Sequence, residues 1–158
     1  MQDFATQHPA MFVGCIFAWT AIMWAVVGVI ISLLSGWRSL SGKYTTEREF
    51  PEHKRRMQSA QMRAATKYNN ILTLASDAEG ITMGLSIRMF PGHPRLFVPW
   101  ADVVVEEPRR YLFVMMRSLR LGPDGIPLRV REPLAEFLLA GKATSGLAGQ
   151  ENGMKWGI

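Results

Sequence analysis

The stretch MFVGCIFAWTAIMWAVVGVIISLL, residues 11–34, decides the organisation of this chain. It contains no charged residue, and as a helix rising ~1.5 Å per residue it is long enough to cross the ~30 Å hydrocarbon core of a bilayer. We therefore expect a short lead over residues 1–10 and a transmembrane helix over residues 11–36. A cleaved signal peptide fits poorly, because no basic residue precedes the apolar run and the run exceeds the usual ~7–15 residues.

Small residues recur along one side of this predicted helix. They are spaced alternately four and three residues apart, at Gly14, Ala18, Ala21, Ala25, Gly28, Ser32 and Ser35. In lipid, helices associate through close backbone approach, which small side chains permit, and a 3.5-residue repeat favours a left-handed crossing. The stripe, which we call the small-residue seam, predicts a helix-packing surface. The pattern leaves open whether the partner helix belongs to a second copy or to another protein.

Charge indicates the orientation of the helix. Residues 1–10 contain Asp3 and no Lys or Arg, whereas eight basic residues stand against three acidic ones between residues 38 and 67. The positive-inside rule then places the N-terminus outside and the C-terminal part in the cytoplasm. Trp37 and Tyr44 are expected as anchors at the membrane–water boundary. The lone cysteine, Cys15, excludes a disulfide framework and agrees with a reducing compartment.

Residues 37–56 read as a basic juxtamembrane connector. Its run Lys54-Arg55-Arg56 is a candidate contact for anionic lipid head groups or an acidic partner, and a solvated basic face explains it equally well.

Residues 57–142 read as a small β domain. Alternating apolar residues and turn-forming Gly, Pro and Asp predict strands at 71–75, 81–88, 95–98, 103–105, 111–121 and 126–131. A short helix follows Glu132-Pro133 and is expected to end at Gly141, before a flexible tail over residues 143–158. The fold class is therefore a membrane-anchored α+β protein, with a curled antiparallel sheet capped by one C-terminal helix.

The segment LFVPWADV, residues 96–103, resembles the I-P-W/Y-x-D/E-I step of bacterial pleckstrin-homology-like (PH-like) domains. The wider segment from Arg88 to Trp100 is similar to a group of single-pass bacterial membrane proteins. The resemblance covers roughly residues 67–140. It implies a seven-stranded curled sheet with a C-terminal helix, a bacterial inner-membrane location, and a superfamily that mostly binds lipids or proteins. It implies no defined activity.

The chain offers little for catalysis. Its histidines, His8, His53 and His93, lack metal-ligand spacing, and neither a nucleophile elbow nor a phosphate-binding loop is present. His93 and Asp102 are the one candidate acid–base pair, which we rank below a structural role. We expect no enzyme activity, no cofactor, no metal and no nucleic-acid partner, since no aromatic stacking platform accompanies the basic residues.

Arginines at 120, 129 and 131 form the best candidate for an anion-binding face. Ile126, Leu128 and Val130 are expected to point into the core, which leaves the three arginines on the wet face. Like charges on neighbouring strands repel, so a bound phosphate or an acidic partner would reduce this repulsion. The alternative is that the three arginines only face water and bind no ligand.

Two functions remain. The first is a non-catalytic accessory subunit of an inner-membrane protein complex, packing through the small-residue seam and a cytoplasmic β domain. The second is a self-associating membrane anchor whose basic face binds anionic lipid.

Overall fold

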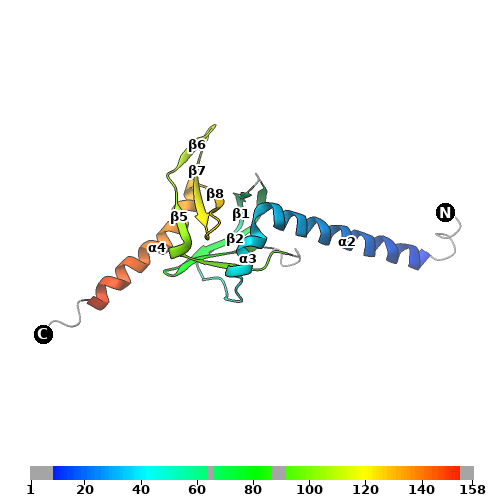
Figure 1. The fold of residues 1–158 in the computed structure, drawn as a ribbon, viewed down its shortest axis with the longest axis horizontal. Coiled ribbons are helices and arrows are strands. Elements are labelled where there is room, and N and C mark those ends of the chain that lie inside the picture. Colours follow the sequence, from blue (N-terminus) through cyan, green and yellow to red (C-terminus); the bar gives the residue numbers. More distant parts are fainter. Residues whose placement is uncertain (1–8, 64–65, 87–91, 154–158) are drawn as a thin grey trace.

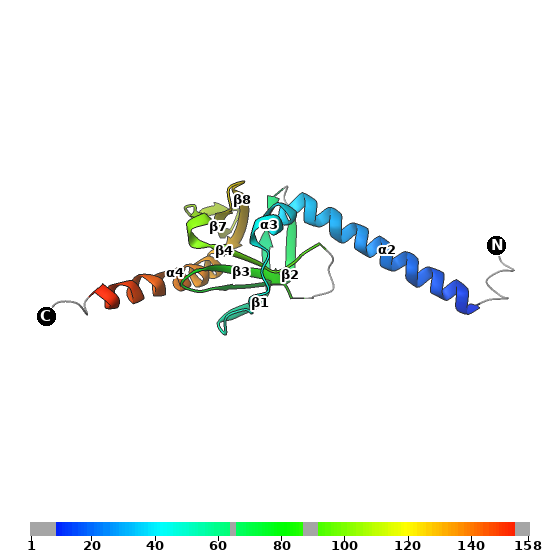
Figure 2. The ribbon, with the colours of Figure 1, turned by 60° about the horizontal axis from the view of Figure 1, so that its bottom comes forward.

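Two helices project from opposite sides of a β domain in the computed structural model, which describes residues 9–63, 66–86 and 92–153. The long apolar helix α2 (Pro9–Ser35) ends at Gly36, and the short helix α3 (Trp37–Tyr44) begins at the next residue. An irregular connector, residues 45–53, then leads into the sheet, and α4 (Glu132–Gly153) closes the chain. The first residues of α2 and the last residues of α4 lie far apart on opposite sides of the domain (Figures 1 and 2).

The sheet in this part of the chain has eight strands and is antiparallel throughout. The strands are β1 (Lys54–Gln61), β2 (Lys67–Ser76), β3 (Gly80–Leu85), β4 (Leu96–Pro99), β5 (Val103–Val105), β6 (Arg109–Tyr111), β7 (Val114–Leu121) and β8 (Ile126–Arg131). A single turn of 3-10 helix, η2 (Trp100–Asp102), joins β4 to β5. The spatial order is β4-β3-β2-β1-β8-β7-β5, with β6 paired to β7. Between β1 and β8 the pairing is reduced to Gln61 opposite Arg129, so the sheet opens there.

The core of the domain contains side chains from segments that are far apart in the sequence. Trp37 and Leu40 of α3 are buried together with the inward side chains of the strands and with Leu134 and Leu138 of α4. Ile126, Leu128 and Val130 are buried as the alternation in β8 predicts. Burial of this apolar surface is the main stabilising contribution to the domain.

The predicted N-terminal apolar helix, antiparallel sheet and C-terminal helix are all present, and the turn between β7 and β8 lies at residues 122–125 as expected. Residues 37–44 form a helix rather than an open connector, and β1 begins at Lys54. The predicted strand 111–121 is divided, because Leu112 has a left-handed backbone (φ 53°) that turns the chain between β6 and β7.

The C-terminal helix is longer than predicted. It continues through Gly141 to Gly153 instead of ending before a tail at residue 143, and residues 154–158 lie outside the described part of the chain. Glycine inside a helix costs only about 1 kcal/mol relative to alanine, which is too little to stop a helix by itself. At Gly141 the missing side chain allows close packing, because a Cβ there would lie 2.4 Å from Ser76 Oγ.

Candidate functional site

The junction between α2 and the β domain contains a buried cluster of polar side chains. We define this helix–domain junction as Ser32, Ser35, Trp37, Tyr68 and His93, all of which are buried. Ser32 Oγ donates a hydrogen bond to the carbonyl oxygen of Gly92 at 2.6 Å, and Trp37 Nε1 donates to the carbonyl oxygen of Pro94 at 3.0 Å. The segment after residue 91 is therefore bonded to the end of α2 and to the start of α3.

A chain of hydrogen bonds crosses the interior of this junction. Tyr68 Oη donates to Ser35 Oγ at 2.8 Å, and Ser35 Oγ donates to the carbonyl oxygen of Ser32 at 3.2 Å. Tyr68 Oη also lies 3.0 Å from Nε2 of His93. Because the single proton of Tyr68 is used toward Ser35, the bond to His93 requires the proton on Nε2. Burial raises the pKa of Tyr68 to about 12, although the hydrogen bond to Ser35 partly opposes this shift.

Aromatic contacts surround the same polar chain. The ring centroid of Trp37 lies 5.2 Å from that of His93 and 5.8 Å from that of Tyr68, and the rings of Tyr68 and His93 are 5.8 Å apart. Such tilted and edge-on pairs are favourable packing geometries. The junction therefore joins α2 to the domain by both polar and apolar contacts.

Helix α3 is fixed at its two ends. At its start, Gly36 has a φ of 80°, and a Cβ at that position would lie 2.7 Å from Cδ1 of Ile126. At its end, Tyr44 Oη donates to Asp102 Oδ2 at 2.6 Å, and Lys43 Nζ lies 3.5 Å from the same oxygen. The bond from Tyr44 and the charge of Lys43 lower the pKa of the Asp102 carboxyl, against a smaller opposing effect of burial.

Trp37 and Tyr44 do not lie where the sequence predicts them. As membrane anchors they would be open to lipid, but their exposed fractions are 0% and 6%, and both belong to the core of the β domain. This placement corrects the expected interfacial role. Each has an apolar ring with one polar atom, and here the polar atom bonds within the domain, to Pro94 and to Asp102 respectively.

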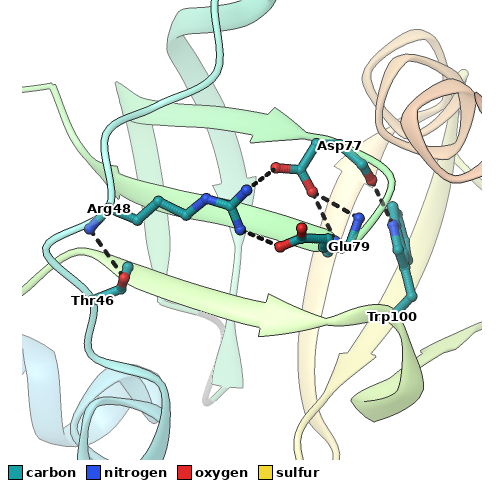
Figure 3. A network of polar contacts seen from close by, with 6 residues as sticks. Thr46, Arg48, Asp77, Glu79 and Trp100 are labelled. Atoms are coloured by element: carbon teal, nitrogen blue, oxygen red, sulfur yellow. Dashed lines mark hydrogen bonds and ion pairs between the residues drawn. The ribbon is translucent and has the colours of Figure 1, made fainter. Parts of the chain in front are cut away.

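The connector that follows α3 is also bonded to the domain (Figure 3). Arg48 reaches the turn between β2 and β3, where its guanidinium lies 3.4 Å from Asp77 Oδ2 and 2.6 Å from Glu79 Oε2. Asp77 in turn accepts bonds from the backbone N–H groups of Glu79 and Gly80, and its carbonyl oxygen accepts one from Trp100 Nε1 at 2.8 Å. These contacts hold the connector across the sheet.

The small-residue seam divides into two parts. Its C-terminal members Gly28, Ser32 and Ser35 are buried in this chain, and Ala25 is half-buried. Its N-terminal members Gly14, Ala18 and Ala21 are exposed, and a Cβ added at Gly14 would meet nothing within 4 Å. The regular spacing of the seam therefore combines positions that pack against the chain's own domain with positions that remain open.

The three basic side chains at the start of β1, Lys54, Arg55 and Arg56, point in two different directions. Lys54 and Arg56 line a pocket of about 340 Å³, and its other polar lining residues are Glu49, Thr73, Ser86 and Arg95. Arg55 lies toward α4, with its guanidinium 4.5 Å from the ring centroid of Phe137 and 3.4 Å from the carbonyl oxygen of Pro133. The three residues thus do not form one surface.

Arg120, Arg129 and Arg131 share one face of β7 and β8, as the register of the strands shows. Arg120 forms an ion pair with Glu106, and the guanidinium of Arg129 lies 5.8 Å from the ring centroid of Tyr111. Nε of Arg129 is buried and has no hydrogen-bond partner in the described part of the chain.

Glu106 reduces the positive charge that the sequence predicts for this face. The hydrogen bond from Arg120 lowers the pKa of Glu106, and the charges of Arg120, Arg109 and Arg129 add to this effect. Sequence reasoning placed the three arginines together but missed their carboxylate partner.

The candidate acid–base pair is not assembled as a site. His93 bonds to Tyr68 in the junction, whereas Asp102 bonds to Tyr44 and Lys43 at the far end of α3. In the part of the chain that the structure describes, no group of three His, Cys, Asp or Glu side chains is placed to hold a metal ion.

Sequence reasoning also missed Tyr68, which links α2 to the domain, because nothing near it in the sequence marks a contact with Ser35. Comparisons of the whole chain with protein-family models, with curated proteins and with solved structures find no match.

Proposed function

We propose that this protein is a non-catalytic accessory subunit of an integral membrane protein complex. In this proposal α2 crosses the bacterial inner membrane once with the N-terminus outside, and a PH-like domain lies on the cytoplasmic side. The observation that carries the proposal is the fixed connection between α2 and the domain at the helix–domain junction.

The exposure of α2 supports a membrane span. The helix is long and apolar enough from Ala10 to Ser35 to cross a bilayer, and only 11% of its most apolar window is buried. A core helix of a soluble protein would be covered by other elements, whereas Phe17 and Trp19 here are 72% and 66% exposed. From Ala10 to Val27, before burial begins at Gly28, the helix is ~27 Å long, which is close to the thickness of the hydrocarbon core.

The fixed connection favours an accessory subunit over a simple anchor. A module that only needs to stay near a membrane works with a flexible linker. Here α2 leads directly into α3, whose Trp37 is fully buried, and the connector after α3 is held by Arg48. If a partner helix packs on α2, the β domain is therefore held at a fixed position and angle relative to that partner. A subunit that braces a complex requires such a fixed placement.

The PH-like identity rests on the sequence resemblance, and the architecture supports it. The antiparallel sheet is followed by a single C-terminal helix that packs against β2, β3, β7 and β8. The resemblance likewise implies an antiparallel sheet with a C-terminal helix, although it implies seven strands and the described sheet has eight.

The exposed half of the seam provides the test. The protein is purified in mild detergent from its native membrane, and co-purifying proteins are sized and identified by mass spectrometry. Stoichiometric recovery with a larger membrane complex is expected. Ala21→Leu should release that complex because it adds bulk to the open part of the seam, while Phe17→Leu, also exposed, should retain it. If the two variants behave alike, the seam does not contact the partner.

The second candidate is a self-associating anchor that binds anionic lipid. The pocket at the start of β1 favours it, because its three cations, Lys54, Arg56 and Arg95, and its two hydroxyl residues can all donate to phosphate oxygens and outnumber its one carboxylate, Glu49. Recovery of the protein alone, as a dimer with bound acidic lipid, would support this candidate and reject the accessory subunit.

A further inference from the structure

The β6–β7 hairpin carries the most exposed large apolar side chains of the described domain. Leu112 and Phe113 at its tip are 88% and 91% exposed, and Tyr111, Val114 and Met115 beside them are also exposed. Leu112 adopts φ 53° to form the turn, a conformation that non-glycine residues seldom take. A contiguous exposed apolar patch of this kind is typical of an interaction surface.

A groove lies at the base of the hairpin. It has a volume of about 340 Å³ and lies between β1 and the hairpin, next to the place where the sheet opens. Its apolar wall comes from Tyr111, Val114 and Met116, and its charged groups are Lys67 and Arg131. Tyr111 and Val114 belong both to the exposed residues of the hairpin and to the groove lining, so the groove and the tip adjoin there as one apolar strip.

The charge around this strip is positive. Among the described residues no carboxylate lines the groove, and Arg109 and Arg110 are exposed at the base of the hairpin. Glu106, after β5, pairs with Arg120, and Glu132, after β8, pairs with Arg117; Glu107 is exposed but does not line the groove. An incoming carboxylate would therefore meet unpaired cations beside an apolar wall.

The direction of the hairpin separates a protein partner from a lipid surface. The hairpin stands away from the rest of the sheet, and in the view of Figure 1 it projects sideways from the line of α2, not along it toward the N-terminal end. A bilayer that contains α2 is therefore not what the tip faces. A concave groove behind a projecting hairpin also fits a protruding segment better than a flat surface.

We propose that the hairpin and its groove bind an acidic, amphipathic segment of a partner protein. Apolar side chains of that segment pack on Phe113, Val114 and Met116, and its carboxylates pair with Lys67 and Arg131. This inference goes beyond the proposed function, because it concerns the β domain and does not depend on the small-residue seam.

The test uses the full chain in neutral-lipid nanodiscs, with empty nanodiscs as the blank. The probe is a short fluorescein-labelled peptide in which Glu alternates with Phe and Leu, and its binding is followed by fluorescence anisotropy. A matched peptide with Gln in place of every Glu is the control. The acidic peptide should bind, its affinity should fall with added salt, and the Gln peptide should bind at least about tenfold more weakly.

Variants of the chain locate the binding site. Phe113→Ser and Arg131→Glu should each weaken binding of the acidic peptide about tenfold or more. Val104→Ser is the matched control, because Val104 is 62% exposed on β5 outside the hairpin, and it should bind as wild type does. Neither Phe113 nor Arg131 belongs to the core, and a thermal melt verifies that each variant is folded. Ala21→Leu should keep full peptide binding, which separates this test from that of the proposed function.

Three results would overturn the inference. The first is equal binding of the acidic and Gln peptides, or of wild type and Phe113→Ser. The second is that wild type binds phosphatidylglycerol vesicles but not the peptide, and that Phe113→Ser does not bind the vesicles. This would make lipid the ligand of the hairpin. The third is a wild-type dimer that Phe113→Ser converts to a monomer, which would make a second copy the occupant.

Discussion

Removal of a single hydroxyl from the helix–domain junction should lower the stability of the β domain markedly. Tyr68→Phe keeps the ring contacts with Trp37 and His93 but deletes the bond to Ser35 at 2.8 Å and the bond to His93 at 3.0 Å. Ser35 and His93 are 0% and 8% exposed, so water does not readily replace the lost partner. A net hydrogen bond contributes about 1 kcal/mol and an unsatisfied buried donor costs about 1–3 kcal/mol, which predicts a loss of about 2–3 kcal/mol.

The assay is urea unfolding of the full chain in neutral-lipid nanodiscs, followed by near-ultraviolet circular dichroism. Tyr111→Phe is the matched control, because Tyr111 is 46% exposed on the hairpin, and its free energy of unfolding should stay within about 0.5 kcal/mol of wild type. A Tyr68→Phe protein as stable as the Tyr111→Phe protein would refute the reasoning, since the junction would then contribute nothing measurable.

Three further predictions concern the titration of Tyr68 and the close packing at two glycines. Because the pKa of Tyr68 is about 12 when folded and about 10 when unfolded, its contribution to stability should be constant below pH 10 and fall by up to about 3 kcal/mol between pH 10 and 12; Tyr68→Phe should lack this component in a pH series of urea unfolding. Gly141→Ala should destabilise the domain by about 1–3 kcal/mol in thermal unfolding, because its Cβ would lie 2.9 Å from the carbonyl carbon of Ser76. Gly36→Ala should destabilise it by a similar amount and raise amide exchange in α3, because of the φ of 80° and the contact with Ile126.

Gly42→Ala is the control for both glycine variants. Gly42 lies in α3 with nothing within 4 Å of its added Cβ, so alanine there should raise stability by about 0.5–1 kcal/mol. If all three glycine variants shift stability in the same direction, close packing at Gly36 and Gly141 does not limit the fold.

The sequence predicted the fold well in segments where one pattern of apolar residues dominates. The alternation in β8 places Ile126, Leu128 and Val130 in the core, and Gly122 and Gly125, both with positive φ, form the turn before it. The charge-free run predicted the long helix, because length and composition suffice for that inference.

Contacts between distant segments could not be predicted from the sequence. Trp37 follows the apolar run and therefore resembles a membrane anchor, but its place in the core depends on Tyr68 and His93, which are far away in the chain. The unbroken spacing of the seam suggests one surface for a partner helix. Ser32 and Ser35 share that spacing, but they bond to the chain's own domain. Small residues favour close approach to any neighbour, so their spacing does not identify which neighbour is present.

The apolar stretch from Tyr111 to Met116 was equally ambiguous. Its composition favours a buried strand, and the structure instead turns it at Leu112 and exposes its tip. Nothing in the residue types distinguishes a core strand from an exposed hairpin here, since both favour aromatic and aliphatic side chains.

The central claim is that α2 and the β domain form one rigid unit. Cys15, the lone cysteine, is exposed on α2 and accepts a spin label, and Ala101→Cys, at an exposed position in η2, accepts a second. Double electron–electron resonance spectroscopy in nanodiscs then measures the distance distribution between the two labels. Our account predicts one narrow distribution for the wild-type junction and a broader one after Tyr68→Phe. A broad distribution in the protein with an intact junction would contradict it, because the domain would then be a tethered module and not a brace.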